Sequence, residues 1–371
     1  MLEYLRTCGN RSLDDLPLGD VDRLIFAQLA YLDLRGAREH QPLAGALAQA
    51  AFDADADATE MRFPYQHADD RNLCARLSAC SRYADVTFEG FYSAYDHAQE
   101  RQFAALALRL PDGAVHLAYR GTDNTLAGWK EDFNLAFMEE IPSQAMASQL
   151  AEALASTAPA LELCGHSKGG NLALYAAVNG SEEVRARLRC AVSFDGPGLS
   201  RRMAESPAWQ ALAGRMRLLT PTFTILGALF HQPEDVRIVE SRAIGPKQHY
   251  PYNWRTDGAD FAYAPRRSRP GQKLGDVLRT ALEQLDPPTR ERFVEAVYEI
   301  IAATGAQTAG DLLNGWLRNT RLMLRQLRVT DRETCRLLGH ALGVFWRAVA
   351  EVMGLPLPER LPDDDDADDQ A

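Results

Sequence analysis

The segment LELCGHSKGGNLALYA, residues 161–176, constrains the fold more than any other part of the chain. An apolar run leads into Gly-His-Ser-Lys-Gly, and a stretch rich in Ala and Leu follows. This order predicts a strand, a sharp turn at Ser167 and a helix from about Gly169 to Val178. Glycines two positions either side of the serine relieve steric conflict, so the turn can expose its hydroxyl above a sheet. The alternative is a small-residue turn without chemistry, and the flanking strand and helix favour a nucleophile.

Strand-like and helix-like runs alternate through the middle of the chain, which is typical of an α/β protein with a mostly parallel sheet. The expected strands are 84–96, two runs that flank the turn Pro111-Asp112-Gly113, 161–164, 190–194, 215–220, 223–230 and 236–241. Apolar residues at helical spacing predict one helix after Asp20 and another over about 143–156.

From about Gly271 onward, successive stretches each carry an apolar face, which predicts one helix after another. Thr330 and Glu333 fit a capping box at the start of the last of these helices. The segment RRSRPGQ, residues 266–272, reads as a linker. We therefore expect three parts: an α/β domain over 1–265, a helical region over 266–355 and an acidic, disordered tail over 356–371.

Composition excludes several classes of protein. The net charge of −11 includes six aspartates of the tail, so the body carries no strong field for steering a cationic substrate. The arginines are dispersed and no base-reading motif occurs, which argues against nucleic acid as a partner. The six cysteines lack zinc-ligand spacing, and no metal or organic cofactor is expected. We find no signal-peptide pattern and no apolar run of 18 residues, so a cytoplasmic protein without a transmembrane segment is expected.

A serine nucleophile needs a histidine base later in the chain. His231 lies at a strand end before a turn, and His340 lies near the apolar face of the last helix, as a buried core residue would. His249 lies in the aromatic-rich loop KQHYPYNW after the last strand-like run. That position is where a serine hydrolase of this architecture places its base.

The acid that orients the histidine is less clearly marked. Asp195 ends the strand that follows the serine-bearing unit, so it should lie at the same edge of the sheet. Asp235 is the competitor, although Pro233-Glu234-Asp235 reads more simply as a turn. A different acid, or none, is the third alternative.

An oxyanion formed at Ser167 would need two hydrogen-bond donors. The backbone N–H of Lys168, at the start of the helix, is the natural first donor, and we expect its side chain to be incidental. The segment AYRGTDN places Thr122 just beyond a strand, where its loop can supply the second. Gly-Thr-Asp is also ordinary turn chemistry, so this segment alone is weak evidence.

Taken together, these segments resemble the α/β-hydrolase superfamily, specifically its class 3 lipase-like group, and most closely the bacterial Mbeg1-like proteins. The resemblance covers roughly residues 13–260 and rests on DLPLGDVDRLIFAQLAYLDL, YRGTDNTLAGWKEDFNLAF, GHSKGGNLALYAA, FDGPG and QHYPYNW. It implies an α/β-hydrolase fold with Ser167 as nucleophile, His249 as base and Thr122 as an oxyanion contact. Trp129 and Asp132 match a W-x-x-D segment, which we interpret as packing and hydrogen bonding.

One departure from the lipase pattern concerns the acid. Fungal-type class 3 lipases carry it in an Asp-Ile-Val-Pro-like segment, where TFTILGALF offers Thr224 and no carboxylate. Pancreatic-type lipases carry it one strand earlier in a Leu-Asp-Pro-like segment, which FDGPG resembles. The resemblance therefore also favours Asp195.

The resulting hypothesis is a serine acyl hydrolase that cleaves a small-molecule or lipid ester through an acyl-enzyme. Two alternatives stay open: a hydrolase-fold binding protein with weak or no catalysis, and an acyl transferase or thioesterase on the same triad. The family resemblance implies the fold more firmly than it implies the function. The C-terminal helices could cover the sheet, cap the site or mediate self-association.

Overall fold

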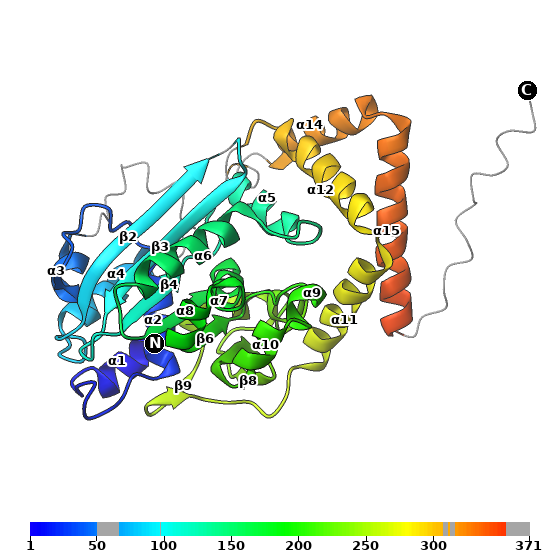
Figure 1. The fold of residues 1–371 in the computed structure, drawn as a ribbon. Coiled ribbons are helices and arrows are strands. Elements are labelled where there is room, and N and C mark those ends of the chain that lie inside the picture. Colours follow the sequence, from blue (N-terminus) through cyan, green and yellow to red (C-terminus); the bar gives the residue numbers. More distant parts are fainter. Residues whose placement is uncertain (50–66, 97, 307–310, 312–315, 354–371) are drawn as a thin grey trace, which may run out of the picture.

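The computed structural model describes residues 1–49, 67–96, 98–306, 311 and 316–353. Its centre is an eight-stranded sheet in which the spatial order of the strands is also their order along the chain (Figure 1). β1 to β4 pair antiparallel, and β4 to β8 pair parallel. The strands are β1 (Gln41–Pro42), β2 (Thr87–Asp96), β3 (Arg101–Arg109), β4 (Val115–Tyr119), β5 (Leu161–His166), β6 (Leu188–Phe194), β7 (Met216–Pro221) and β8 (Asp235–Val239), with a separate ribbon of β9 (Thr256–Asp257) and β10 (Asp260–Phe261).

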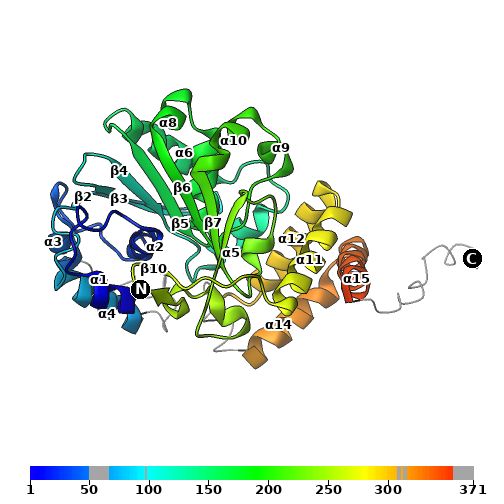
Figure 2. The same ribbon diagram turned by 90° about the horizontal axis from the view of Figure 1, so that it is seen from below.

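Helices cover both faces of the sheet and make three layers (Figure 2). One apolar core lies under α2 (Asp20–Leu29), and a second lies under α6 (Pro142–Ala155), α7 (Lys168–Asn179) and α10 (Pro207–Leu212). The remaining helices and 3-10 turns are α1 (Leu2–Cys8), α3 (Leu43–Ala48), α4 (His67–Ser78), α5 (Leu126–Asn134), α8 (Glu182–Arg187), α9 (Arg201–Ala204), η3 (Ala213–Arg215), η4 (Leu226–Ala228), η5 (Gly245–His249), η6 (Pro251–Asn253), α11 (Arg269–Gln284), α12 (Pro287–Ala302), α14 (Trp316–Val329) and α15 (Arg332–Met353). This is an α/β-hydrolase fold with a helical C-terminal region, as expected from the sequence.

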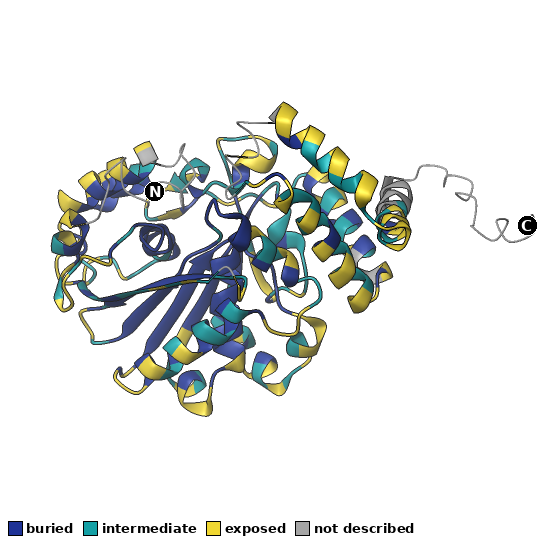
Figure 3. Cartoon of the chain, turned by 90° about the horizontal axis from the view of Figure 1, so that it is seen from above, coloured by how far each residue is buried: buried dark blue, intermediate teal, exposed yellow. Residues whose placement is uncertain are grey.

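The inner strands are apolar because they are covered on both sides. Every residue of β4 and of β5 is buried, and Figure 3 shows the sheet as the continuous buried centre of the molecule. Strands buried on both faces read as unbroken apolar runs rather than as alternating ones. The runs at 161–164 and 190–194 are therefore strands of the sheet interior.

Three of the expected features are wrong. The segment 223–230 is a loop that contains η4 rather than a strand, because it packs against α11 instead of pairing with β7. The last helix is capped by Asp331, whose Oδ1 accepts from the Thr334 N–H at 2.9 Å. The Thr330 hydroxyl instead donates back to the Gln326 carbonyl, because Thr330 still closes the preceding helix. α11 begins at Arg269, inside the expected linker.

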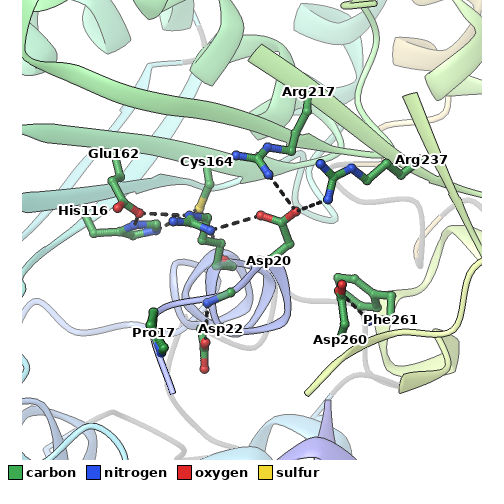
Figure 4. A network of polar contacts seen from close by, with 12 residues as sticks. Pro17, Asp20, Asp22, His116, Glu162, Cys164, Arg217, Arg237, Asp260 and Phe261 are labelled. Atoms are coloured by element: carbon green, nitrogen blue, oxygen red, sulfur yellow. Dashed lines mark hydrogen bonds and ion pairs between the residues drawn. The ribbon is translucent and has the colours of Figure 1, made fainter. Parts of the chain in front are cut away.

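A buried polar network fastens α2 to the sheet at the amino-terminal ends of the parallel strands (Figure 4). Asp20 accepts from Arg23 at 3.1 Å and from Arg217 of β7 at 3.3 Å. Arg23 also donates to Glu162 of β5 at 2.9 Å, and His116 of β4 lies 3.4 Å from the same oxygen. Burial opposes ionisation, but the contacts with His116 and Arg23 prevail and lower the pKa of Glu162 to about 2. This edge of the sheet is therefore held together by charge.

The helices α11, α12, α14 and α15 lie on the opposite side of the molecule from α1, α3 and α4 (Figure 2). α11 borders the loop after β7, where Arg267 donates to the Gly227 carbonyl at 2.9 Å. α12 borders α5, where Lys130 stacks on the Tyr298 ring at 4.6 Å and Arg290 donates to the Ala136 carbonyl at 2.9 Å. The acidic tail expected over 356–371 lies outside the described residues.

Candidate active site

Ser167 occupies the turn between β5 and α7 with a φ of 59° and a ψ of −132°. A positive φ is uncommon for a residue other than glycine, and its strain persists only where the surroundings impose it. Here the Ser167 N–H donates to the Phe194 carbonyl at 2.9 Å, which ties the turn to β6. A Cβ at Gly169 would overlap with the Tyr119 carbonyl, so only glycine permits the helix to start this close to the sheet. The predicted nucleophile thus stands in the strained strand–turn–helix that its chemistry requires.

Asp195 follows β6 directly and is fully buried, also with a positive φ, 52°. One carboxylate oxygen, Oδ1, accepts from the hydroxyls of Thr220, at 2.9 Å, and Thr224. Thr224 in turn accepts from the Gly227 N–H at 2.9 Å, which fixes the direction of its hydroxyl hydrogen. Thr224, in the loop after β7, therefore donates a hydrogen bond to Asp195, which follows the preceding strand β6.

His249 ends η5, and its Nδ1 lies 2.7 Å from Asp195 Oδ2. A carboxylate only accepts, so Nδ1 carries the hydrogen of this contact and Nε2 is left for a further partner. The preceding residue holds the loop, because Gln248 Oε1 accepts from the Thr222 hydroxyl at 2.9 Å. The Gln248 carbonyl also accepts from the Trp254 indole at 2.8 Å, so both ends of the aromatic-rich loop are anchored.

His166, the residue just before the serine, was not singled out by the sequence. Its Nε2 lies 2.9 Å from the His249 carbonyl, and its Nδ1 lies 3.1 Å from the Tyr31 hydroxyl. A carbonyl only accepts, so Nε2 carries the hydrogen and Nδ1 accepts from Tyr31. Burial is the main cause that lowers the pKa of His166 well below its usual value, and a positive charge on the His249 ring would add to it, so the His166 ring is neutral. The sequence feature that could have indicated His166 is its place directly before Ser167 in the G-x-S-x-G motif, at the end of a strand.

The serine and the histidine reach the same edge of the sheet but are not hydrogen-bonded to each other. Among the described residues no hydrogen bond from the Ser167 hydroxyl occurs, whereas the rings of His166 and His249 lie 4.6 Å apart. Asp235 is exposed at the start of β8 and pairs with Arg237 at 3.0 Å, away from His249. His340 is exposed rather than buried, because it lies on the outer side of α15.

The loop after β4 lies directly against the serine turn. A Cβ at Gly121 would overlap with the Tyr31 hydroxyl and come within 3.0 Å of the Ser167 Cβ. The next residue, Thr122, donates its hydroxyl to Asp132 Oδ2 at 2.5 Å. Because that hydroxyl points toward Asp132, the backbone N–H of Thr122 is the donor left for a ligand. Within the described chain neither this N–H nor that of Lys168 forms a hydrogen bond.

Asp132 is held in an unusual state. Its Oδ1 is buried and has no hydrogen-bond partner among the described residues. Burial raises the pKa of Asp132 to about 6, against the opposing effects of the Lys168 charge and the Thr122 hydrogen bond. The Asp of the W-x-x-D segment therefore fixes the orientation of Thr122, while Trp129 on the same helix is exposed.

The side chain of Lys168 is not incidental, as the sequence had suggested. It is buried, and its Nζ donates to Glu131 Oε2 at 2.6 Å and to the Gln102 carbonyl at 2.7 Å. Glu131 is also fully buried and accepts from the Ser143 N–H at 2.9 Å. A charge at this depth needs such partners. The ion pair therefore ties the start of α7 to α5, the helix that follows the Thr122 loop.

No group of three or more His, Cys, Asp or Glu side chains in the described ranges is arranged to hold a metal ion. The Ser167 hydroxyl, the His249 imidazole and the two unoccupied N–H donors are the kinds of group that acyl transfer requires.

A family model described as Mbeg1-like matches residues 77–299, more than half of the chain. A solved structure titled "Crystal structure of M37 lipase" is similar to this chain with a TM-score of 0.36 and 13% sequence identity. That similarity covers 56% of this chain and 68% of the M37 lipase chain. A search of curated proteins gives no match.

Proposed function

The chain belongs to the Mbeg1-like family, and from that premise we propose that it is a serine acyl hydrolase acting on a carboxylic ester. The observation that carries the proposal is the 2.7 Å contact between His249 and the buried Asp195, at the sheet edge where Ser167 occupies its strained turn. The three groups follow β5, β6 and β8 in the order nucleophile, acid, histidine, which is the chain order of this fold.

In the proposed reaction the Ser167 Oγ attacks the ester carbonyl carbon while His249 Nε2 takes the hydroxyl proton. The carbonyl oxygen becomes an oxyanion and accepts from the N–H groups of Thr122 and Lys168. When the tetrahedral intermediate collapses, the C–O bond to the alcohol breaks and the imidazolium returns its proton to the leaving oxygen. Water then attacks the acyl-enzyme by the same route and releases the carboxylic acid.

Asp195 has two tasks in this scheme. It keeps the hydrogen of His249 on Nδ1, so that Nε2 faces the serine as a base. It also stabilises the imidazolium that forms when the proton arrives. The hydroxyls of Thr220 and Thr224 occupy its other oxygen and so hold the carboxylate in position.

The proposal is tested by labelling purified protein with a fluorophosphonate probe and assaying p-nitrophenyl esters of increasing chain length. We expect Ser167→Ala and His249→Ala to lose labelling and to lose about 10³-fold or more in kcat. The exposed Ser156→Ala and His340→Ala are matched controls that keep both. If folded wild-type protein neither labels nor hydrolyses any ester, the hydrolase proposal fails and a binding function replaces it.

Thioester hydrolysis and acyl transfer would use the same groups. Acyl-thioester substrates, and a second alcohol added to the ester assay, distinguish them. A higher kcat/KM on thioesters, or an ester product with the added alcohol, would replace ester hydrolysis as the reaction. In this scheme residues 1–265 form the hydrolase domain, and the helical region over 266–355 borders two of its loops.

A further inference from the structure

The exposed face of α14 combines positive charge with apolar side chains. Four arginines (Arg318, Arg321, Arg325 and Arg328) are exposed, and the helix contains no acidic residue. Three large apolar side chains are exposed beside them: Leu317 at 55%, Leu324 at 52% and Val329 at 72%. At 100° per residue all seven fall within one half of the helix. The face is therefore both cationic and apolar, in a chain with a net charge of −11.

The opposite half of α14 is used for packing. Asn319 is buried and donates to the Asp311 carbonyl at 2.9 Å, and Leu322, Met323 and Leu327 are partly buried. The helix lies at an outer corner of the molecule, beside α12 (Figures 1 and 2). The arginine face is thus turned away from the fold.

The four arginines lie without partners among the described residues. In the part of the chain that the structure describes, none of the four forms an ion pair or a side-chain hydrogen bond. The exposed glutamates of the neighbouring α12, at 291, 295 and 299, leave them unpaired. Elsewhere on the surface exposed arginines do find carboxylates, as Arg292 does with Glu333 at 2.5 Å.

We propose that this face of α14 binds an anionic lipid surface, with the helix lying in the plane of the interface. Arginines would contact the lipid phosphates and carboxylates, while the leucines and the valine enter the boundary between head groups and acyl chains. A nucleic acid would bind the arginines through its phosphates but would offer no contact for the three apolar side chains. None of the described helices is long and apolar enough to cross a membrane, so α14 lies on the bilayer rather than in it.

The expected strength follows from the charge. Each arginine close to an anionic bilayer raises the binding constant by about fivefold, so four contribute a factor of roughly 600 at physiological salt. The attraction is screened within about 10 Å at 0.1 M salt, so binding should weaken steeply as salt is added. The proposal is independent of the hydrolase reaction, because binding is measured without turnover.

The test is vesicle flotation of the full chain with 3:1 phosphatidylcholine–phosphatidylserine vesicles and with pure phosphatidylcholine vesicles. We expect binding only to the anionic vesicles, at least 50-fold weaker after Arg318, Arg321, Arg325 and Arg328 are changed together to glutamine. Leu324→Ser with Val329→Ser should weaken binding at high salt, where the apolar contacts dominate. The charge-matched control changes exposed arginines elsewhere (Arg6, Arg35, Arg189 and Arg255) to glutamine and should bind as wild type. Circular dichroism establishes that each variant is folded.

Several outcomes would overturn the proposal. These are equal binding to both vesicles, no binding by wild type, or equal loss in the control variant. The tail aspartates 363–366, 368 and 369 offer a competing occupant for the same face. If wild type fails to bind and a variant with these six changed to asparagine binds, the tail is the occupant. If a short fluorescent DNA duplex binds through the four arginines and the vesicles do not, the face is a nucleic-acid site.

Discussion

The Nε2 of His166 lies 2.9 Å from the backbone carbonyl of His249, so the residue before the serine holds the main chain of the histidine. Tyr31, in the turn after α2, donates to the other nitrogen of the same ring. The turn after β5, the loop after β8 and the amino-terminal helix layer therefore meet at one neutral imidazole.

Replacing His166 should impair turnover without altering substrate binding. His166→Phe keeps a ring but leaves the His249 carbonyl without its donor, at a cost of about 1–3 kcal/mol, or roughly 5- to 150-fold in kcat. We expect KM and the pH profile of kcat to stay close to wild type, because the lost group is neutral. Tyr31→Phe, which removes only the hydroxyl, should have a smaller effect. Unchanged kcat in His166→Phe would contradict the positioning role.

Thr224, at the position where fungal-type lipases carry their acid, should also contribute to activity. Thr224→Val keeps the shape of the side chain and removes its hydroxyl donor to Asp195. Thr220 still donates to the same oxygen, so we expect a modest loss of about 1 kcal/mol, or about fivefold in kcat/KM. Thr222→Val, which instead breaks the contact with Gln248, serves as the comparison. A Thr224→Val enzyme with full activity would show that the acid needs only one donor.

The buried pair of Lys168 and Glu131 should be costly to break from one side. Lys168→Met leaves an uncompensated buried carboxylate and should lower the free energy of unfolding by about 3–5 kcal/mol. Adding Glu131→Gln removes that charge and should restore part of the loss, which urea unfolding of the four proteins would measure. The same cycle on the exposed pair Arg201 and Glu205 should give a much smaller coupling, because solvent screens both charges. No recovery in the double variant would mean that packing, not charge, is decisive.

The raised pKa of Asp132 should make the protein less stable as the pH rises. Its pKa is raised from 3.8 to about 6 in the folded protein, so folding takes up a proton there. Its stabilising contribution is complete below about pH 4 and is lost as the pH rises through 6. Asp132→Asn cannot titrate, so the stability of this variant relative to wild type should rise by up to about 3 kcal/mol between pH 4 and pH 7. Unfolding at both pH values, with the exposed Asp14→Asn as control, would check this. A difference that stays constant with pH would refute it.

The sequence predicted those parts of the molecule that depend on local pattern. The turn at Ser167, the strand end at Asp195 and the loop around His249 each follow from residues within about ten positions of one another. The network that joins His166, Tyr31 and His249 spans distant segments, and a single sequence carries no mark of such contacts. The side chain of Lys168 was misjudged for the same reason, because Glu131 comes close only once α5 and α7 have folded.

The segment 223–230 shows how tertiary contacts override a local pattern. Its apolar residues suit a strand, but Thr224 is committed to Asp195, and Ala228 faces Gly275 of α11 so closely that a Cβ there would overlap. A continuous strand would place successive side chains on opposite faces and break both contacts. The local pattern predicted that the segments after residue 265 are helical. It did not predict that α11 packs against the loop 223–230 and so determines its shape beside the candidate site.

The charged network of Asp20, Arg23 and Glu162 lies at the opposite end of the parallel strands from Ser167. The charged network and the candidate active site therefore lie at opposite ends of the same strands. Substitutions in the charged network can raise or lower stability against heat and acid, while the end of the strands that carries Ser167 keeps its geometry. The loops after β4 to β8 could therefore be redesigned while the contacts that fasten α2 to the sheet stay intact.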